Sequence, residues 1–149
     1  MAVMSVARFE RFFRAAAGLD VDKDDLKRYS EFVNRKLYHL LLLGQARASD
    51  DGRDVVEPSD LPITKGLQET VHDFRALDEE VQLRPILDQL AALPPLDRPL
   101  SDRAQARLPE VVGGLSLALA RSFTIIDPSL KNPSSEHWER VFRIFDLLV

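Results

Sequence analysis

A run of acidic residues is the part of the sequence that most resembles a metal-binding site. Asp20, Asp22 and Asp24 alternate along the chain, and Glu31 follows at a spacing that matches several ligand positions of a calcium-binding EF-hand loop. The sixth position of such a loop requires a glycine for a sharp turn, and here it is Asp25. We therefore expect these carboxylates to cap the N-terminus of a helix and to complement its dipole, not to bind a metal.

Residues that could support catalysis are present but not in catalytic patterns. The three histidines, His39, His72 and His137, are far apart in sequence and form no HxxxH or HExxH pair. Ser59 and Ser134 are each placed to cap a helix, and no GxSxG, Walker-type or dinucleotide-binding motif occurs. The chain contains no cysteine, which excludes disulfides, thiolate zinc sites and cysteine nucleophiles. We expect no enzymatic activity, no cofactor and no metal.

Basic residues near the N-terminus form the best candidate for a DNA-binding surface. The candidates are Arg8, Arg11, Arg14, Lys23 and Lys27. The first three recur at every third position, mainly off the apolar face of the helix that carries them. Glu10 and the acidic run described above are interspersed with them, so the alternative is an ordinary solvated surface of mixed charge.

The overall composition describes a globular chain without a basic character. Apolar residues make up 45% of the sequence, and no apolar run approaches the length of a membrane-spanning helix. Charged residues early in the N-terminal segment interrupt any signal-peptide core, so we expect a cytoplasmic protein. The chain has 20 basic and 24 acidic residues, a net charge of −4, and each half is more acidic than basic. Nucleic-acid-binding proteins usually show a basic footprint, so this balance lowers the expectation of DNA binding.

The first half of the chain predicts a medium helix, a long helix and another medium helix. Residues 7–17 place phenylalanines on one face and end at Gly18, and a long helix can run without proline from about Asp22 to residue 49. Residues 40–43 are all leucine, which predicts burial from several directions. Ser59 is expected to cap the third helix, with Pro62 tolerated in its first turn.

The second half predicts the same order of helices more loosely. An amphipathic segment spans residues 81–92, a long segment spans residues 101–127 with Ser101 as its N-cap, and Ser134 caps the last helix. Pro109 and the pair Gly113-Gly114 are expected to kink the long segment. Two units of one helical plan, residues 1–77 and 78–149, are therefore expected to form one compact body.

The stretch from Gly52 to Leu61 resembles a known structural family. Gly52-Arg53, a short extended segment and then Asp60 resemble the part of the histone fold that links the long helix to the last helix. In histones, that arginine and that aspartate form an ion pair. The whole chain, including residues 60–69 and 93–97, resembles a bacterial family of proteins that contain two histone folds. The resemblance implies an all-α pseudo-dimer, monomeric as a chain, whose two tandem histone folds pair head to tail, with Arg53 and Asp60 as a structural pair.

The same resemblance bears on function through positions where the chain departs from histones. Where DNA-wrapping histones usually carry an arginine after the first helix, this chain has Val21, and Asp54 and Val55 follow Arg53 in place of lysine and threonine. An acidic side chain there would repel phosphate. We expect a non-catalytic, nucleoid-associated protein with weak or specialised contact to duplex DNA. The alternative is a protein-interaction scaffold that does not bind DNA.

Overall fold

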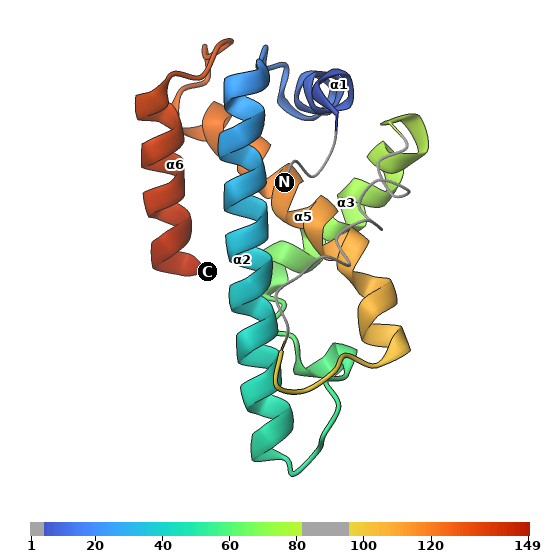
Figure 1. Ribbon diagram of the computed structural model, residues 1–149. Coiled ribbons are helices and arrows are strands. Elements are labelled where there is room, and N and C mark those ends of the chain that lie inside the picture. Colours follow the sequence, from blue (N-terminus) through green and yellow to red (C-terminus); the bar gives the residue numbers. More distant parts are fainter. Residues whose placement is uncertain (1–4, 82–95) are drawn as a thin grey trace.

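The structure, a computed structural model, describes residues 5–81 and 96–149 (Figure 1). Its helices are α1 (Val6–Ala17), α2 (Lys23–Asp50), α3 (Lys65–Val81), α5 (Asp102–Ile126) and α6 (Ser135–Leu148), and one 3₁₀ turn, η1 (Pro58–Asp60), precedes α3. The described residues contain no strand, only an isolated bridge between Val56 and Leu100. The all-α prediction is confirmed. Most of the amphipathic segment expected over residues 81–92 lies outside the described residues.

Local capping residues fix most helix ends where the sequence predicts them. The Ser101 hydroxyl accepts a hydrogen bond from the Ala104 backbone N–H (3.0 Å) at the start of α5, and the Ser134 hydroxyl accepts one from the His137 N–H (3.4 Å) at the start of α6. Gly18 ends α1 in the left-handed conformation (φ 65°), which glycine adopts without steric cost.

The prediction that Ser59 caps the third helix is wrong. Pro62 disfavours helical backbone at the residue before it, and Leu61 is accordingly extended (φ −71°, ψ 129°). The residues around Ser59 therefore form only the single turn η1, and α3 begins later, at Lys65. Thr64 provides the cap instead, because its hydroxyl accepts a hydrogen bond from the Leu67 N–H (3.2 Å).

The glycine pair in α5 allows close packing of another helix. α5 is one helix from Asp102 to Ile126 with Pro109 inside it, and its ribbon changes direction along its length (Figure 1). A Cβ atom on Gly113 would lie 2.3 Å from the ring of Phe74, and one on Gly114 would lie 2.5 Å from Val71 Cγ2. Both contacts are to α3. The two glycines therefore allow α3 to approach the α5 backbone closely. The sequence predicted kinks at these positions and did not predict this close packing.

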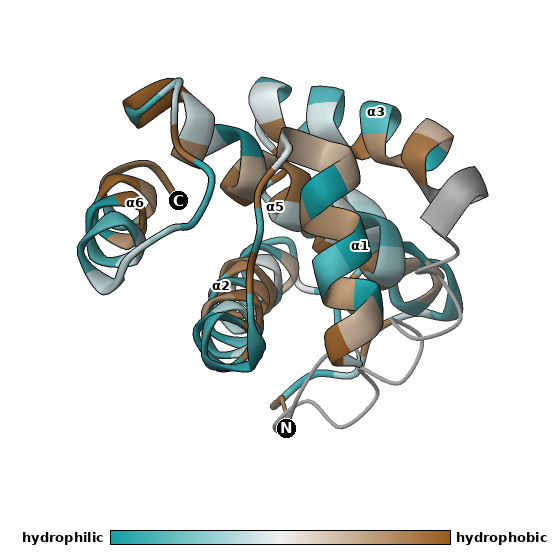
Figure 2. Cartoon of the chain, turned by 90° about the horizontal axis from the view of Figure 1, so that it is seen from above, coloured by the Kyte–Doolittle hydropathy of each residue, from teal (hydrophilic) through white to brown (hydrophobic). Residues whose placement is uncertain are grey.

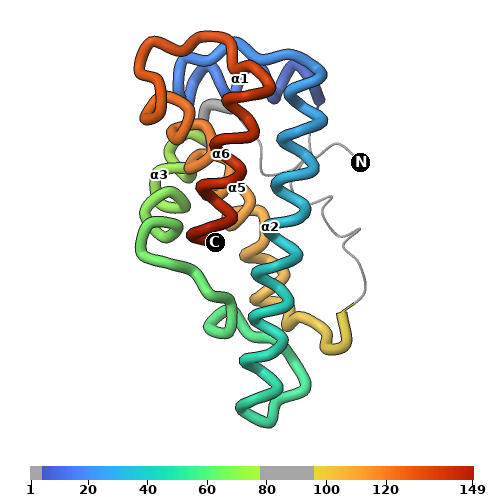
Figure 3. Tube along the Cα trace, turned by 90° about the vertical axis from the view of Figure 1, so that its left-hand side faces the viewer, coloured from blue at the N-terminus to red at the C-terminus, as the bar shows by residue number. Residues whose placement is uncertain are grey.

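Loops that are far apart in sequence lie side by side at the two ends of the long helix α2. At one end, the Asp20 N–H donates to the Lys131 carbonyl (2.7 Å), which joins the loop after α1 to the loop after α5. At the other end, the Val56 N–H donates to the Pro99 carbonyl (2.9 Å), and the Val56 carbonyl accepts from the Ser101 N–H (2.9 Å). Figure 3 shows α6 beside the first half of α2. The two halves of the chain are thus connected at both ends.

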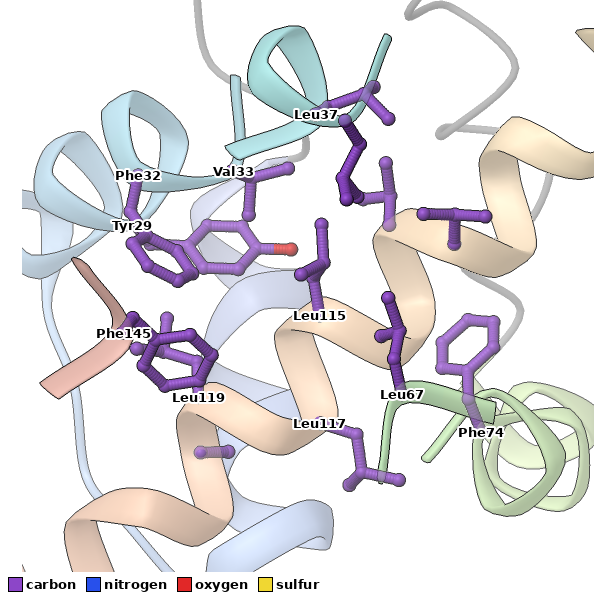
Figure 4. Packing of buried hydrophobic residues seen from close by; sticks show 14 of the residues in the cluster. Tyr29, Phe32, Val33, Leu37, Leu67, Phe74, Leu115, Leu117, Leu119 and Phe145 are labelled. Carbon is purple, nitrogen blue, oxygen red and sulfur yellow. The ribbon is translucent and has the colours of Figure 1, made fainter. Parts of the chain in front are cut away.

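The core lies between α2, α5 and the shorter helices. Figure 4 shows Tyr29 of α2 directed toward Leu115 of α5, with Phe74 of α3 on the far side of α5. The Tyr29 hydroxyl and the Ser116 hydroxyl share a buried hydrogen bond (2.7 Å), so this polar pair is satisfied inside the core. Helix α5 is long and apolar enough to cross a membrane by length and composition, but 61% of its most apolar stretch is buried inside the protein, as in the core helix of a soluble domain.

The leucine run in α2 is only half buried. Leu40 and Leu41 are buried as expected, but Leu42 and Leu43 are 38% and 57% exposed. The expectation of burial on every side is wrong for these two residues, because their side chains lie on a solvent-exposed part of the α2 surface.

Candidate nucleic-acid interface

The five basic candidates lie at one end of the molecule. Arg8, Arg11 and Arg14 are on α1, and Lys23 and Lys27 are in the first turns of α2. α1 lies beside the beginning of α2 at the top of the molecule and faces the viewer when the protein is seen from above (Figures 1 and 2). All of these side chains are exposed except Arg8, which is partly buried. The structure thus brings the predicted residues to the same end.

The apolar face of α1 fixes the helix to the core. Phe9, Phe12 and Phe13 are fully buried, and the Phe9 and Phe13 rings contact the Tyr29 ring of α2 at centroid distances of 5.1 and 5.7 Å. The Ser5 hydroxyl accepts from the Arg8 N–H (3.4 Å) and caps the helix. A helix held in this way presents its arginines from a rigid support.

Two of the acidic residues at this end, Asp22 and Asp25, cap the start of α2. The Asp22 carboxylate accepts from the backbone N–H groups of Asp24 (2.9 Å) and Asp25 (3.0 Å), and Asp25 accepts in return from the Asp22 N–H (3.0 Å). This reciprocal arrangement is a capping box. Among the residues that the structure describes, no group of three or more histidine or acidic side chains is placed to hold a metal ion.

Asp25 has a second, buried role. Its carboxylate is 6% exposed and accepts a hydrogen bond from the Trp138 indole N–H of α6 (2.7 Å). Burial raises the pKa of the Asp25 carboxyl above its usual range, and the backbone and indole hydrogen bonds oppose that rise. Asp25 therefore joins the start of α2 to α6.

The ion pair of Arg14 restrains that side chain only weakly. Arg14 lies 3.7 Å from the Asp20 carboxylate, but both side chains are more than half exposed. Exposed pairs of this kind contribute little, because solvent screens them and ordering the side chains costs entropy. Arg14 therefore remains accessible to another anion.

Sequence reasoning did not include Lys131 among the basic residues at this end. Lys131 lies in the loop after α5, and its carbonyl accepts from the Asp20 N–H. Lys131 is exposed and is more than a hundred positions away from the other candidates in the chain. No local pattern could identify it, because only the pairing of the two loops places it here.

The histidines do not form a common site. His39 and His72 are exposed on α2 and α3. The His137 ring accepts a hydrogen bond from the Ser134 N–H (3.0 Å), so it completes the N-terminal cap of α6. Each of the three is therefore explained by a helix surface or a helix end.

Arg53 and Asp60 are paired at the opposite end of α2. Arg53 Nη1 donates to Asp60 Oδ2 (2.6 Å), and Arg53 Nη2 donates to Asp60 Oδ1, a two-point contact that also fixes geometry. The Asp60 carboxylate is 2% exposed and also accepts from the Glu57 N–H (2.8 Å). The hydrogen bonds from Arg53, followed by that from Glu57, lower the pKa of Asp60 to about 2. The pair joins the end of α2 to η1.

We expect Arg53→Ala to lower the melting temperature by several degrees, because it leaves the buried Asp60 carboxylate without its main partner. The matched control is Arg140→Ala, which removes an exposed arginine from its pair with Glu136 (2.7 Å) and should have little effect. Thermal unfolding followed by circular dichroism measures both. Equal melting temperatures for the two variants would contradict the structural role of Arg53.

The difference between wild type and Arg53→Ala should also depend on pH. The folded pKa of Asp60 is about 2 and its ordinary value is 3.8, so its contribution to stability is present above 3.8 and is lost as the pH falls through about 2. The difference in melting temperature between wild type and Arg53→Ala should therefore become smaller as the pH falls from 3.8 to about 2. A constant gap would show that Arg53 acts independently of the Asp60 charge.

One protein-family model matches almost the whole chain. It is the model of the family described as a domain of unknown function (DUF1931), and it matches residues 9–146. The chain belongs to this family. An uncharacterized protein of Aquifex aeolicus (strain VF5) is 34% identical to it over 130 residues, and the match covers 78% of this chain and 75% of the relative. A second uncharacterized protein of that organism is 25% identical over 139 residues, or 93% of this chain and 81% of the relative.

Two crystal structures of similar proteins have the same fold as this chain. A protein from Thermus thermophilus is 53% identical and superimposes with a TM-score of 0.88 over 99% of both chains. A protein from Aquifex aeolicus is 24% identical and has a TM-score of 0.82, covering 96% of this chain and 94% of the other. At that lower identity the likeness concerns the fold alone.

Proposed function

We propose that this member of the family is a double histone fold whose two halves, residues 1–77 and 78–149, pair head to tail. The two loop pairings support the proposal, because they join the first loop of one half to the last loop of the other at both ends of α2. The Arg53–Asp60 pair also supports it, at the position that the resemblance to histones implies. One chain then supplies both partners, so folding would not depend on protein concentration.

On this fold we propose a non-catalytic, cytoplasmic, nucleoid-associated function with weak contact to duplex DNA. The observation that carries the proposal is the basic face of α1, whose arginines project from a helix anchored by three buried phenylalanines. Phosphate contacts from such a face would position the protein on DNA without reading its sequence. The net charge of −4 and the local carboxylates argue for weak binding.

Extended wrapping of DNA is not part of the proposal. Val21 is buried, so the loop after α1 offers no side chain to a phosphate at that position. Asp54 is exposed beside Arg53, and Arg53 is already bound to the carboxylates of Asp60 and Asp51. We therefore place the contact at α1 and the start of α2 only.

We expect fluorescence anisotropy to detect binding to a short duplex at low salt and to show steep weakening as salt increases. Replacing Arg8, Arg11 and Arg14 together by Gln should reduce the slope of log affinity against log salt by about 2–3, at roughly 0.9 for each phosphate contact. The control replaces three paired surface arginines on other helices, Arg103, Arg121 and Arg140, by Gln. It removes the same charge. Equal losses in both variants, or no binding at low salt, would refute the α1 contact.

A second candidate function is that of a protein-interaction scaffold without DNA binding. The observation in its favour is an apolar face at the end of α6, where Ile144, Leu147 and Leu148 are 40%, 85% and 74% exposed. Large exposed apolar side chains grouped on one face often mark a protein contact. Failure of the DNA experiment would leave this function as the one to pursue.

A further inference from the structure

A cavity at the Arg53 end of α2 combines an apolar wall with three arginines. It has a volume of about 600 Å³ and lies between the last turns of α2, the segment leading into α3, and the first turns of α3 and α5. This size is within the range of small-molecule sites. Its apolar lining includes Leu61, Ile63 and Val71, and its charged lining includes Arg47, Arg75 and Arg107.

Positive charge exceeds negative charge within this cavity. Arg75 Nη2 donates to the Glu110 carboxylate (3.0 Å), and Arg107 Nε lies 3.9 Å from the same carboxylate oxygen. Two guanidinium groups thus share one carboxylate in the cavity lining, and Arg47 adds a third positive charge. Arg75 and Arg107 are 53% and 57% exposed, so both are accessible to a ligand.

The opposite end of the molecule provides an internal comparison. A cavity of about 660 Å³ lies where the N-termini of α2 and α6 meet. Its lining contains more carboxylates than basic groups: Asp22, Asp24, Asp25 and Glu31 against Lys27 and Arg28. Of these two cavities of similar size, the one at the C-terminal end of α2 is lined by more basic than acidic side chains.

We propose that the cavity lined by Arg47, Arg75 and Arg107 binds a small organic anion that has an apolar body and an oxyanion head, either a phosphate or a carboxylate. Guanidinium groups bind both head groups through paired N–H donors. Leu61, Ile63 and Val71 supply the surface for the apolar body. The proposal does not rest on DNA binding. The cavity is lined by Arg47 in the last turns of α2, and α1 lies beside the other end of that helix (Figure 1).

Isothermal titration calorimetry on the full chain tests this site with four probes: octyl phosphate, octanoate, inorganic phosphate and octanol. We expect at least one of the two amphipathic anions to bind at least tenfold more tightly than inorganic phosphate or octanol. The preferred anion identifies the head group. Failure of both amphipathic anions to bind, or binding no tighter than that of inorganic phosphate, would overturn the proposal.

Two variants on one helix locate the binding. Arg107→Gln should weaken the better amphipathic anion at least fivefold, because it removes a cavity-lining cation that makes only a long contact with Glu110. Arg103→Gln, one turn earlier in α5, removes the same charge from an arginine that pairs with Glu57 and does not line the cavity. It should bind as the wild type does. Equal affinities in the two variants would place the anion elsewhere.

Discussion

Trp138→Ala is expected to destabilise the protein by about 3–5 kcal/mol, the usual cost of deleting a buried tryptophan. The Trp138 side chain is 1% exposed and contacts the Phe123 ring edge-on, at a centroid distance of 4.7 Å. Its removal would leave a cavity between α5 and α6 and would deprive the buried Asp25 of a hydrogen bond. Chemical denaturation measures the free energy of unfolding. A loss below about 1 kcal/mol would contradict the assignment of Trp138 to the core.

Trp138→Phe separates the hydrogen bond from the packing. A phenylalanine keeps much of the apolar contact but cannot donate to Asp25, so the pKa of Asp25 should rise further. The pKa of Asp25 in the folded protein already exceeds the ordinary value of 3.8. The protonated carboxyl therefore stabilises the folded protein at low pH, and this stabilisation is lost as the pH rises through the folded pKa. Because the folded pKa of Asp25 is higher in Trp138→Phe, the free energy of unfolding of this variant should fall more than that of the wild type as the pH rises. An identical pH dependence would show that the indole does not influence Asp25.

Gly113→Val should be the second large effect, with a loss of about 1–3 kcal/mol or more from overpacking. Even the first side-chain atom would lie 2.3 Å from the Phe74 ring, and Phe74 is 2% exposed with little room to move. The matched control is Gly66→Ala in α3, where a Cβ meets nothing within 4 Å. That change should be neutral or slightly stabilising, since alanine favours helix.

A double variant tests the cause of the Gly113 effect. Combining Gly113→Ala with Phe74→Leu should recover part of the stability that Gly113→Ala loses alone, because leucine has no ring at the point of contact. Additive losses in the double-mutant cycle would show that Phe74 is not the obstacle.

The sequence by itself determined the features that depend on neighbouring residues. Ser101, Ser134 and Gly18 mark helix ends because a cap acts on backbone groups within a few positions. The phenylalanine stripe predicted the buried face of α1 for the same reason. Arg53 and Asp60 are seven residues apart, so a short loop suffices to bring them together.

The start of α3 shows how neighbouring signals can conflict. Serine is a residue type that favours the N-cap position, and this predicted a cap at Ser59. Pro62, however, disfavours helical backbone at Leu61. The backbone restriction prevailed over the capping preference, and Thr64 became the cap. This outcome is local and could have been derived from the sequence by weighing Pro62 more heavily.

Only the tertiary structure decided which distant groups meet. The hydrogen bond from Trp138 to Asp25 joins residues 113 positions apart, and the pairing of Asp20 with Lys131 joins two separate loops. The role of Gly113 depends on the position of Phe74 in another helix. Periodicity shows which face of a helix is buried, but it does not show which helix covers that face. The cavity lined by Arg47, Arg75 and Arg107 is visible only after three helices are packed, because each arginine taken alone is an ordinary exposed residue.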